Sequence, residues 1–311
     1  GQQDVTRCIR VRTNRSGQPS HTDLVPVRVF VDSRAVHETM SGQRSPGTNS
    51  LWGRRVLGPM PRSQTQTEIT SRDSGNMKLA DRWRAVTDAA APVDMPDARL
   101  VVMAPHPDDE SLMCGGLIAR HRRLGGDVVI VAVTDGGAAY DPGGDPRLAR
   151  RRVGEQRHAS RVLGVDDDPV RLHIPDGCVG ANEDRLASEM ESLITAGDVV
   201  VAPWLHDTHP DHDAVARAAV VAARATSTVV MMAPVWMWHR VSPCAAPSVP
   251  LRQIRLTPAD VDAKLTALRC HVSQFVRPGG TPILDHDSIE QATWAREYYY
   301  RNADLVASHA R

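Results

Sequence analysis

The sequence is poor in aromatic residues, in unbalanced charge and in long apolar runs. Aromatic residues make up 4% of its 311 residues, with two Phe, four Tyr and six Trp. The 37 Lys and Arg equal the 37 Asp and Glu in number, so the formal net charge is zero at pH 7. A broad electrostatic attraction to nucleic acid or anionic membranes is therefore not predicted. No apolar stretch approaches a transmembrane helix in length, and the polar N-terminus is not typical of a secretory signal.

Cysteine is also scarce, and its spacing is uninformative. The five cysteines are scattered, and no two of them form a C-x-x-C pair. This pattern predicts no disulfide framework and favours a reducing, cytoplasmic location, with a secreted enzyme whose signal has been removed as the alternative. Hydrophobic residues make up 41% of the chain, which is enough for a sizeable core in one large domain or two small ones. The cysteines are Cys8, Cys114, Cys178, Cys244 and Cys270.

Residues 1–76 differ in composition from the rest of the chain. They contain eleven Arg and six acidic residues among many Ser, Gln, Gly and Thr. The segment 24–31 is apolar enough to form a strand, although Pro26 argues against a central position in a sheet. We predict a partly disordered N-terminal arm or leader over residues 1–76 and a globular domain over residues 77–311.

From about residue 98, apolar runs alternate with segments of helical periodicity. The runs lie at 99–104, 127–134, 170–174, 198–203 and 228–233. Helices are predicted near 110–124, 147–163, 183–196, 211–225, 258–270 and 286–300. This alternation predicts an α/β fold with a mostly parallel sheet and helices on both faces. In such sheets, ligands bind beyond the carboxyl ends of the strands.

A histidine and three acidic residues follow the first of these strands, in the motif His106-Pro-Asp-Asp-Glu110. One interpretation is structural, because prolines extend the turn and an acidic residue caps the following helix. The other interpretation is catalytic. In it, His106 and Asp109 bind a metal ion, and Asp108 beside them acts as a general base. The motif by itself leaves both interpretations open.

A second motif, His209-Pro-Asp-His212, follows the strand predicted over 198–203 and comes just after His206-Asp207. Three histidines and two aspartates in seven positions at a strand end favour a metal site over a chance surface cluster. Two His and one Asp give a three-ligand site with an open position, which suits Zn²⁺, with Fe²⁺ as a second candidate. Cys114, about one turn into the preceding helix, is expected to pack. A non-haem iron oxygenase is disfavoured because such enzymes usually have a jelly-roll fold.

Together with five further elements in the same order, these motifs resemble the LmbE-like, or PIG-L-type, family of metal-dependent N-deacetylases. The resemblance covers about residues 98–300. It implies a Rossmann-like domain with C-terminal elements that cap the substrate, and the removal of acetyl from an N-acetylglucosamine unit. The matching elements are Ala104-Pro-His-Pro-Asp-Asp-Glu110, Thr134-Asp-Gly-Gly137, Arg152-Val-Gly-Glu155, Leu163-Gly-Val165, Pro175-Asp-Gly177, His209-Pro-Asp-His212 and His271-Val-Ser-Gln274.

The resemblance also implies a role for each matching residue. Asp108 would be the general base, and a positively charged His209 would stabilise the oxyanion or protonate the leaving amine. Arg152 and Asp176 match positions that hold sugar hydroxyls or a neighbouring group. Some members of the family have a Tyr where this chain has Asp207, so the role of that Tyr in polarising the carbonyl is open here. The implied metal ligands are His106, Asp109 and His212.

Two regions are candidate walls for the substrate. The loop 140–145 is rich in glycine, and the stretch 231–239 combines three Met with Trp236 and Trp238. The second region is interpreted either as a buried strand that enters a packed loop or as an adaptable apolar wall for a bulky ligand. Tyr298–Tyr300 is expected to pack within the helix predicted over 286–300, with stacking on the substrate as the alternative.

The substrate expected from these walls is a bulky glycoconjugate. Within the family, the chain resembles the deacetylases of glycopeptide-antibiotic biosynthesis, which act on an N-acetylglucosaminyl pseudoaglycone of the teicoplanin kind. A thiol glycoside and a glycosyl lipid are alternative substrates for the same site. A non-catalytic sugar-binding module is an alternative function, against which the presence of Asp108 argues.

Overall fold

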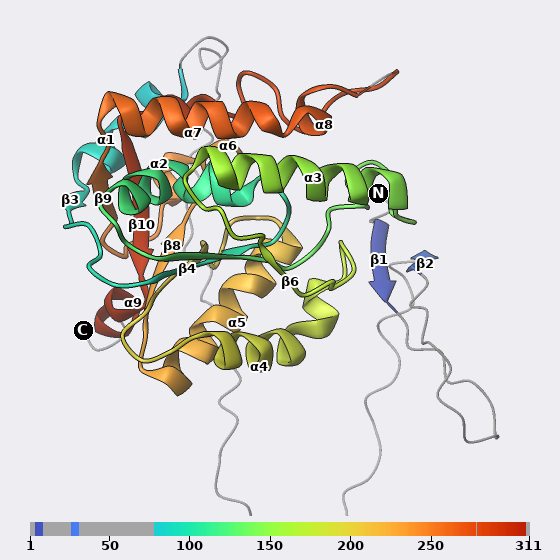
Figure 1. Cartoon of the computed structure of the whole chain (residues 1–311), viewed down its shortest axis with the longest axis horizontal. Helices are drawn as coiled ribbons and strands as arrows, with labels where there is room; N and C mark the ends of the chain where they lie inside the picture. Colours follow the sequence, from blue (N-terminus) through green and yellow to red (C-terminus); the bar gives the residue numbers. More distant parts are fainter. Residues whose placement is uncertain (1–3, 9–25, 31–77, 278, 309–311) are drawn as a thin grey trace, which may run out of the picture. The chain divides into compact units, whose positions relative to one another are not determined.

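The computed structural model describes residues 4–8, 26–30, 78–277 and 279–308, and the chain divides into two units, Gly1–Met77 and Lys78–Arg311. In the first unit, β1 (Asp4–Cys8) and β2 (Pro26–Phe30) pair as a two-stranded antiparallel sheet (Figure 1). The strand predicted within 24–31 is thus present as β2, at the edge that its proline requires. The prediction of an arm over the rest of residues 1–76 lies outside the described residues.

The second unit is built on an eight-stranded sheet in the order β3-β9-β10-β8-β7-β4-β5-β6. All five predicted apolar runs form strands, and these five pair in parallel with their neighbours among them. They are β4 (Leu100–Ala104), β5 (Val128–Ala132), β6 (Val170–Arg171), β7 (Val199–Pro203) and β8 (Val229–Ala233). The other three strands are β3 (Ala91–Pro92), β9 (Arg252–Arg255) and β10 (Arg296–Arg301).

Helices cover both faces of the sheet, which confirms the predicted α/β class (Figure 1). On one face lie α1 (Leu79–Asp88), α4 (Glu183–Leu193) and α5 (Pro210–Thr226). On the other face lie α2 (Asp109–Arg123), α3 (Pro146–Val162) and α7 (Pro258–Cys270). Strand residues alternate between the two cores, as Val101 and Val102 of β4 show. The sequence is apolar in unbroken runs because each central strand is covered on both sides.

The helix predicted over 286–300 is wrong. That segment forms a short 3-10 turn, η3 (Glu290–Thr293), followed by β10, which pairs antiparallel with both β8 and β9. The three tyrosines of β10 are buried on alternate faces: Tyr298 and Tyr300 enter one core and Tyr299 enters the other. Aromatic side chains suit such a two-sided strand, and long-range pairing outweighs the local helical pattern.

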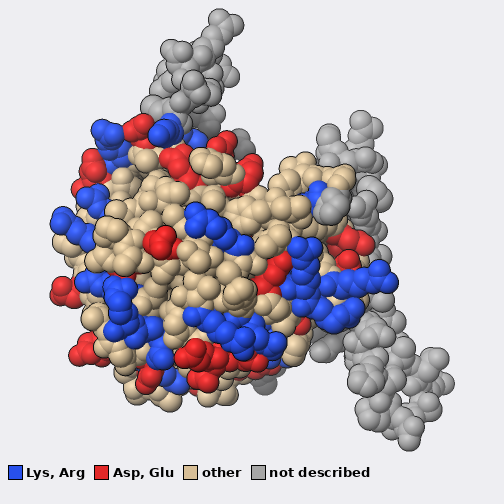
Figure 2. All heavy atoms as spheres, turned by 45° about the horizontal axis from the view of Figure 1, so that its top comes forward, with Lys and Arg blue, Asp and Glu red and all other residues tan. Residues whose placement is uncertain are grey.

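The segment after β8 is predicted to cap the substrate, but most of it completes the sheet and the helical layer as β9, α7 and β10. The remaining short elements are η1 (Val179–Asn182), α6 (Met237–Arg240), η2 (Pro243–Ala245), α8 (Val272–Phe275) and α9 (Asn302–Ser308). None of the helices in the described part of the chain is long and apolar enough to span a bilayer. Basic and acidic side chains are interspersed over the face shown in Figure 2, as expected from the balanced composition.

Three described cysteines, Cys114, Cys244 and Cys270, are free thiols, whereas Cys178 is joined in a disulfide. The scattered cysteine spacing does not predict this bond, because spacing carries no information about which residues meet in the fold. Cys114 is fully buried in the core, as expected for a packing residue.

Candidate metal centre and active site

The sheet brings the two sequence motifs together. Strands β7, β4, β5 and β6 are consecutive neighbours and run parallel, so their carboxyl ends lie along one edge. The first motif follows β4 and the second follows β7, while the Thr134–Gly137 loop follows β5 and Asp176 follows β6. Four loops that are distant in the sequence therefore meet at one place.

The three predicted metal ligands converge at this edge. Oδ2 of Asp109 lies 3.2 Å from Nδ1 of His106 and 3.2 Å from Nε2 of His212. All three ligand atoms lie within 4.8 Å of one another. Nε2 of His212 is buried and makes no hydrogen bond beyond this ion-pair contact with Asp109, so both groups are placed to bind a cation together. The donor set therefore consists of two imidazoles, one of them that of His212, and one carboxylate. Such a set fits Zn²⁺ or Fe²⁺.

A buried carboxylate fixes the orientation of His212. Oδ2 of Asp207 lies 2.8 Å from Nδ1 of His212, so the other ring nitrogen is the one presented to a metal. Asp207 is fully buried, and its carboxylate accepts three backbone N–H groups, from Val235, Trp236 and Met237, at 2.7, 3.1 and 3.0 Å. With its oxygens engaged in this way, Asp207 is a positioning group for His212 and does not take the place of a carbonyl-polarising Tyr.

Removing the Asp207 carboxylate is expected to weaken metal binding. We expect Asp207→Ala to lower the affinity for Zn²⁺ by about 10- to 100-fold, because His212 loses the partner that sets its tautomer and orientation. Competition with a chromogenic chelator at fixed pH measures the affinity, and Asp167→Ala, at an exposed position, is the control. If Asp207→Ala proves unfolded, Asp207→Asn should give a smaller loss. A folded Asp207 variant with unchanged affinity contradicts the positioning role.

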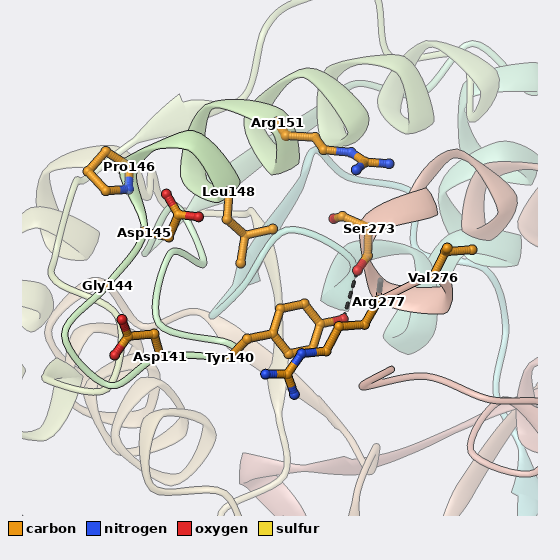
Figure 3. A pocket seen from close by; sticks show the side chains of 10 residues that line it. All are labelled: Tyr140, Asp141, Gly144, Asp145, Pro146, Leu148, Arg151, Ser273, Val276 and Arg277. Atoms are coloured by element: carbon orange, nitrogen blue, oxygen red, sulfur yellow. Dashed lines mark hydrogen bonds between the residues drawn. The ribbon is translucent and has the colours of Figure 1, made fainter. Parts of the chain in front are cut away.

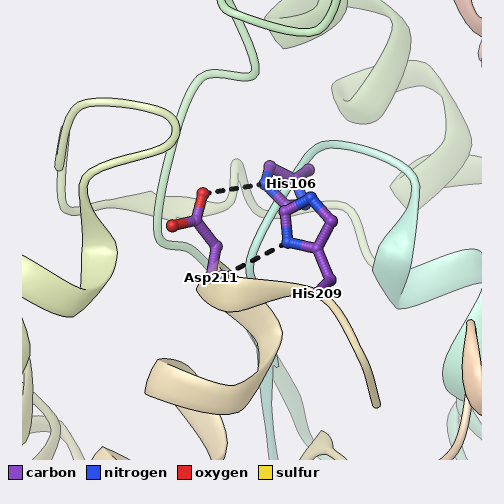
Figure 4. A group of neighbouring side chains, drawn as sticks. All are labelled: His106, His209 and Asp211. Carbon is purple, nitrogen blue, oxygen red and sulfur yellow. Dashed lines mark hydrogen bonds and ion pairs between the residues drawn. The ribbon is translucent and has the colours of Figure 1, made fainter. Parts of the chain in front are cut away.

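A second candidate group of ligands shares His106 and consists otherwise of His209 and Asp211 (Figure 4). In this group the ligand atoms already have protein partners. Nδ1 of His209 accepts the backbone N–H of Asp211 at 3.2 Å, and the Asp211 carboxylate accepts the N–H groups of Gly177 and Val179. Asp211 also lies 3.3 Å from Nε2 of His106. The group around His212 is therefore the better metal site. The Asp211 carboxylate contacts Nε2 of His106, whereas Nδ1 of the same ring faces Asp109.

Asp176 and Arg152, predicted to hold sugar hydroxyls or a neighbouring group, both contact groups of the site. Asp176 lies 3.3 Å from Nε2 of His106 and accepts the N–H of Ala138 at 2.7 Å. Arg152 is 3% exposed, and its guanidinium donates to the carbonyls of Gly136 and Pro107, each at 2.9 Å. Of the two predicted roles of Arg152, these contacts agree with the second, holding a neighbouring group, because the side chain is buried between the first motif and the loop after β5.

Asp108, the predicted general base, lies in the first motif next to the predicted ligand Asp109. Its side chain is buried, and one oxygen is 3.2 Å from the Arg152 guanidinium. Burial raises the pKa of Asp108 to about 6, with Arg152 opposing the shift. Its backbone has a φ of 143°, a conformation that costs a non-glycine residue about 1–3 kcal/mol and that is concentrated at functional sites.

The surroundings of His209 and His212 shift the pKa values of these two histidines in opposite directions. Burial, together with the nearby charges of His106 and His212, lowers the pKa of His209 to about 3, so the predicted positive charge on His209 is not supported. Because Nδ1 accepts a hydrogen bond, a neutral His209 carries its proton on Nε2. Burial also opposes protonation of His212, but the carboxylates of Asp109 and Asp207 outweigh it and raise its pKa to about 9. The same carboxylates would favour a cation.

Sequence reasoning gave no role to a buried polar network behind Asp108. Glu110 is fully buried, accepts from Nε2 of Gln156 at 2.9 Å and lies 3.1 Å from Nε2 of His271. Ser111 also contacts His271, at 3.3 Å. The only signal for this network was the presence of Glu110 and His271 within matched motifs, and that signal carried no geometry.

The two tryptophans predicted to contact substrate have different surroundings. Trp238 is 3% exposed and packs edge-on against Trp83 at 4.9 Å, while its indole N–H donates to the carbonyl of Pro234. Its predicted substrate contact is therefore not supported, and the interpretation as a buried loop holds. Trp236 is only partly buried and lies beneath the guanidinium of Arg240, 4.3 Å from the ring centroid.

The site lies in a segment with known relatives. Residues 101–223 match the protein-family model described as PIG-L: GlcNAc-PI de-N-acetylase. A 1D-myo-inositol 2-acetamido-2-deoxy-alpha-D-glucopyranoside deacetylase of Streptomyces avermitilis is 39% identical over 83 residues, which cover 24% of this chain and 28% of that protein. A diacetylchitobiose deacetylase of Thermococcus kodakarensis is 31% identical over 125 residues, covering 37% and 45%. The chain thus spans less than half the length of each of these two relatives.

A solved structure shares the fold. The zinc-inhibited form of a teicoplanin deacetylase superposes with a TM-score of 0.51 at 19% identity, covering 66% of this chain and 97% of that chain. At this identity the likeness shows a common architecture, in agreement with the parallel sheet and the two helical layers described above.

Proposed function

We propose that the protein is a metal-dependent deacetylase that removes the acetyl group from the N-acetylglucosamine unit of a conjugate. The observation that carries the proposal is the convergence of His106, Asp109 and His212, with the buried carboxylate of Asp108 beside them. The family match and the names of the two relatives, both deacetylases of N-acetylglucosamine units, support the same reaction.

The residues at the site would divide the chemistry among them. An ion held by His106, Asp109 and His212 would supply Lewis-acid chemistry, acidifying water and polarising the amide carbonyl. Asp108 accepts a proton as the water oxygen bonds to the acetamide carbon, and Nε2–H of His209 donates to the developing oxyanion. Asp108 then returns the proton to nitrogen as the C–N bond breaks. The products are a free amine on the sugar and acetate.

Zinc is the metal we propose, with Fe²⁺ as the second candidate, because two imidazoles and a carboxylate suit both ions. We expect treatment with a chelator to abolish deacetylation and added Zn²⁺ to restore it. Metal analysis of His212→Ala should show lower occupancy than the wild type, whereas Asp167→Ala should show none of this loss. Full metal occupancy in His212→Ala would remove His212 from the ligand set.

The narrower proposal for the substrate is a teicoplanin-type N-acetylglucosaminyl pseudoaglycone. Its support in the structure is the partly exposed Trp236 beside the second motif, since Trp238 is in the core. Mass spectrometry of the zinc-loaded protein with this pseudoaglycone should show a loss of about 42 Da, one acetyl group, that disappears with a chelator. Activity on a simpler N-acetylglucosamine conjugate alone would support the proposed deacetylation but contradict the teicoplanin-type substrate. No acetate from any such conjugate, with metal bound, would favour a sugar-binding module.

A further inference from the structure

A pocket of about 500 Å³ lies between the loop that joins β5 to α3 and the short helix α8 (Figure 3). We propose that this pocket binds a carboxylate or phosphate group on the part of the substrate beyond the acetylated sugar, with Arg277 as the main contact. The inference deepens the deacetylase function proposed above and depends on it for the identity of the substrate. The pocket is lined by Tyr140, Asp141, Gly144, Asp145, Pro146, Leu148, Arg151, Ser273, Val276 and Arg277.

Both walls of the pocket continue directly from residues of the candidate site. In the β5–α3 loop, the backbone N–H of Ala138 binds Asp176, which contacts His106, and the pocket begins two residues later at Tyr140. In the other wall, His271 contacts Glu110 behind the first motif, and the pocket begins two residues later at Ser273. Each wall of the pocket thus begins two residues from a backbone segment that contacts the site or its supporting network, and we infer that a group attached to the sugar extends in this direction.

Hydrogen bonds between the walls hold the pocket in shape. The Tyr140 hydroxyl donates to the carbonyl of Ser273 at 2.7 Å. The N–H and hydroxyl of Ser273 in turn donate to the Glu155 carboxylate of α3, at 3.0 and 2.6 Å. A pocket that is already formed loses little conformational entropy when a ligand enters, and this volume lies within the range of small-molecule sites.

The charged groups of the pocket differ in whether they have partners. Asp141 accepts the N–H of Gly143, Asp145 caps α3 by accepting the N–H of Arg147, and Nε of Arg151 donates to Glu155. These residues are exposed, and their bonds are those of an ordinary turn, helix cap and helix surface pair. Their arrangement by itself selects no ligand.

Arg277 is the exception. Its guanidinium lies over the ring of Tyr140, 4.4 Å from the centroid, and no carboxylate among the described residues pairs with it. Stacking on an aromatic ring orients the planar guanidinium while leaving its N–H donors available. An anionic oxygen group is the ligand that such donors bind most strongly, often through two parallel hydrogen bonds. Asp141 and Asp145 would keep an anion away from their own part of the pocket and direct it to Arg277.

The main comparison in the test is between a charged substrate and its neutral ester. The probes are ω-carboxyalkyl glycosides of N-acetylglucosamine with short, medium and long chains, their neutral methyl esters, and N-acetylglucosamine 1-phosphate. We expect the wild type to prefer the best carboxylate over its ester, and Arg277→Gln to lower kcat/KM for that carboxylate about tenfold while leaving the ester unchanged. Arg277→Lys should retain part of the preference. Arg150→Gln, on the exposed side of the same region and outside the pocket, is the matched control.

Failure of the pocket and failure of the deacetylase function give different results. Equal turnover of acid and ester by the wild type refutes anion binding in the pocket but leaves the deacetylase function intact. A preference for the acid that survives in Arg277→Gln does the same. If neither the probes nor the pseudoaglycone is deacetylated with metal bound, the deacetylase function fails. Calorimetric titration with the carboxyalkyl glycoside of glucose, which has no acetamide, then tests whether the pocket binds the carboxylate. Binding that is about tenfold weaker in Arg277→Gln supports the pocket, and binding that is absent or equal in both proteins refutes it. A preference for the phosphate alone identifies phosphate as the source of the anion.

Discussion

Asp108→Asn is expected to lower kcat by about 10²- to 10⁴-fold while the protein keeps its metal. The substitution preserves the shape of the side chain and removes its ability to accept a proton. Asparagine also tolerates positive φ better than most residues, so the 143° backbone conformation should survive. Steady-state kinetics and metal analysis on the same sample measure both quantities.

The two measurements on Asp108→Asn separate the roles that the residue could have. Loss of metal together with activity would make Asp108 a ligand and undo the assignment of His106, Asp109 and His212 as the complete protein set. Retained activity with retained metal would place the general base elsewhere. Asp167→Asn, at an exposed position, controls for the handling of the variants. A change in KM without a change in kcat would assign Asp108 to binding alone.

Glu297→Ala is expected to destabilise the fold by about 3–5 kcal/mol, because it leaves a buried charge without a partner. Glu297 of β10 is 3% exposed and lies 2.7 Å from the Lys264 ammonium, which is equally buried. Its carboxylate also accepts the backbone N–H groups of Gly116 and Leu117, both at 2.9 Å, and the Tyr299 hydroxyl at 2.9 Å. Urea unfolding followed by circular dichroism measures the loss, with the exposed Glu191→Ala as the control.

A second variant tells which of these contacts matters. Helix α2 is interrupted at Cys114, where φ and ψ are −149° and 25°, and Glu297 accepts the N–H groups just after the break. In the double variant Glu297→Leu with Lys264→Met, both charges are absent, and the helix N–H groups and the Tyr299 hydroxyl lose their acceptor. Full recovery of stability would attribute the loss to the unpaired Lys264 alone. Partial recovery is the expected result, since buried N–H groups without acceptors cost about 1–3 kcal/mol.

The interruption in α2 also connects this buried pair to the candidate site. The first turn of α2 begins at Asp109 and carries Glu110, whereas the part after Cys114 is held by β10. Because the helix is broken, the turn that bears the ligand takes a direction independent of the rest of the helix. A folded but weakened Glu297→Gln variant is therefore expected to lower metal occupancy as well as stability.

The sequence by itself determined the central sheet and the meeting of its motifs. The runs that became β4, β5, β7 and β8 are unbroken and rich in branched residues, a pattern that only strands covered on both faces need. Parallel strands then place their carboxyl ends along one edge, so the proximity of His106, Asp109 and His212 followed from the order of runs and motifs.

The tertiary structure alone decided what each buried polar side chain binds. Residues 296–301 became a strand because β8 and β9 lie on either side, although their local pattern suggested a helix. Arg152 turned inward to the first motif, and Asp207 met His212 and a loop 28 to 30 residues further along the chain. Glu297 reached Gly116 across 181 residues. Sequence periodicity reports which face of an element is buried, but the partner of a buried charge is chosen by contacts between distant segments, which no local pattern records.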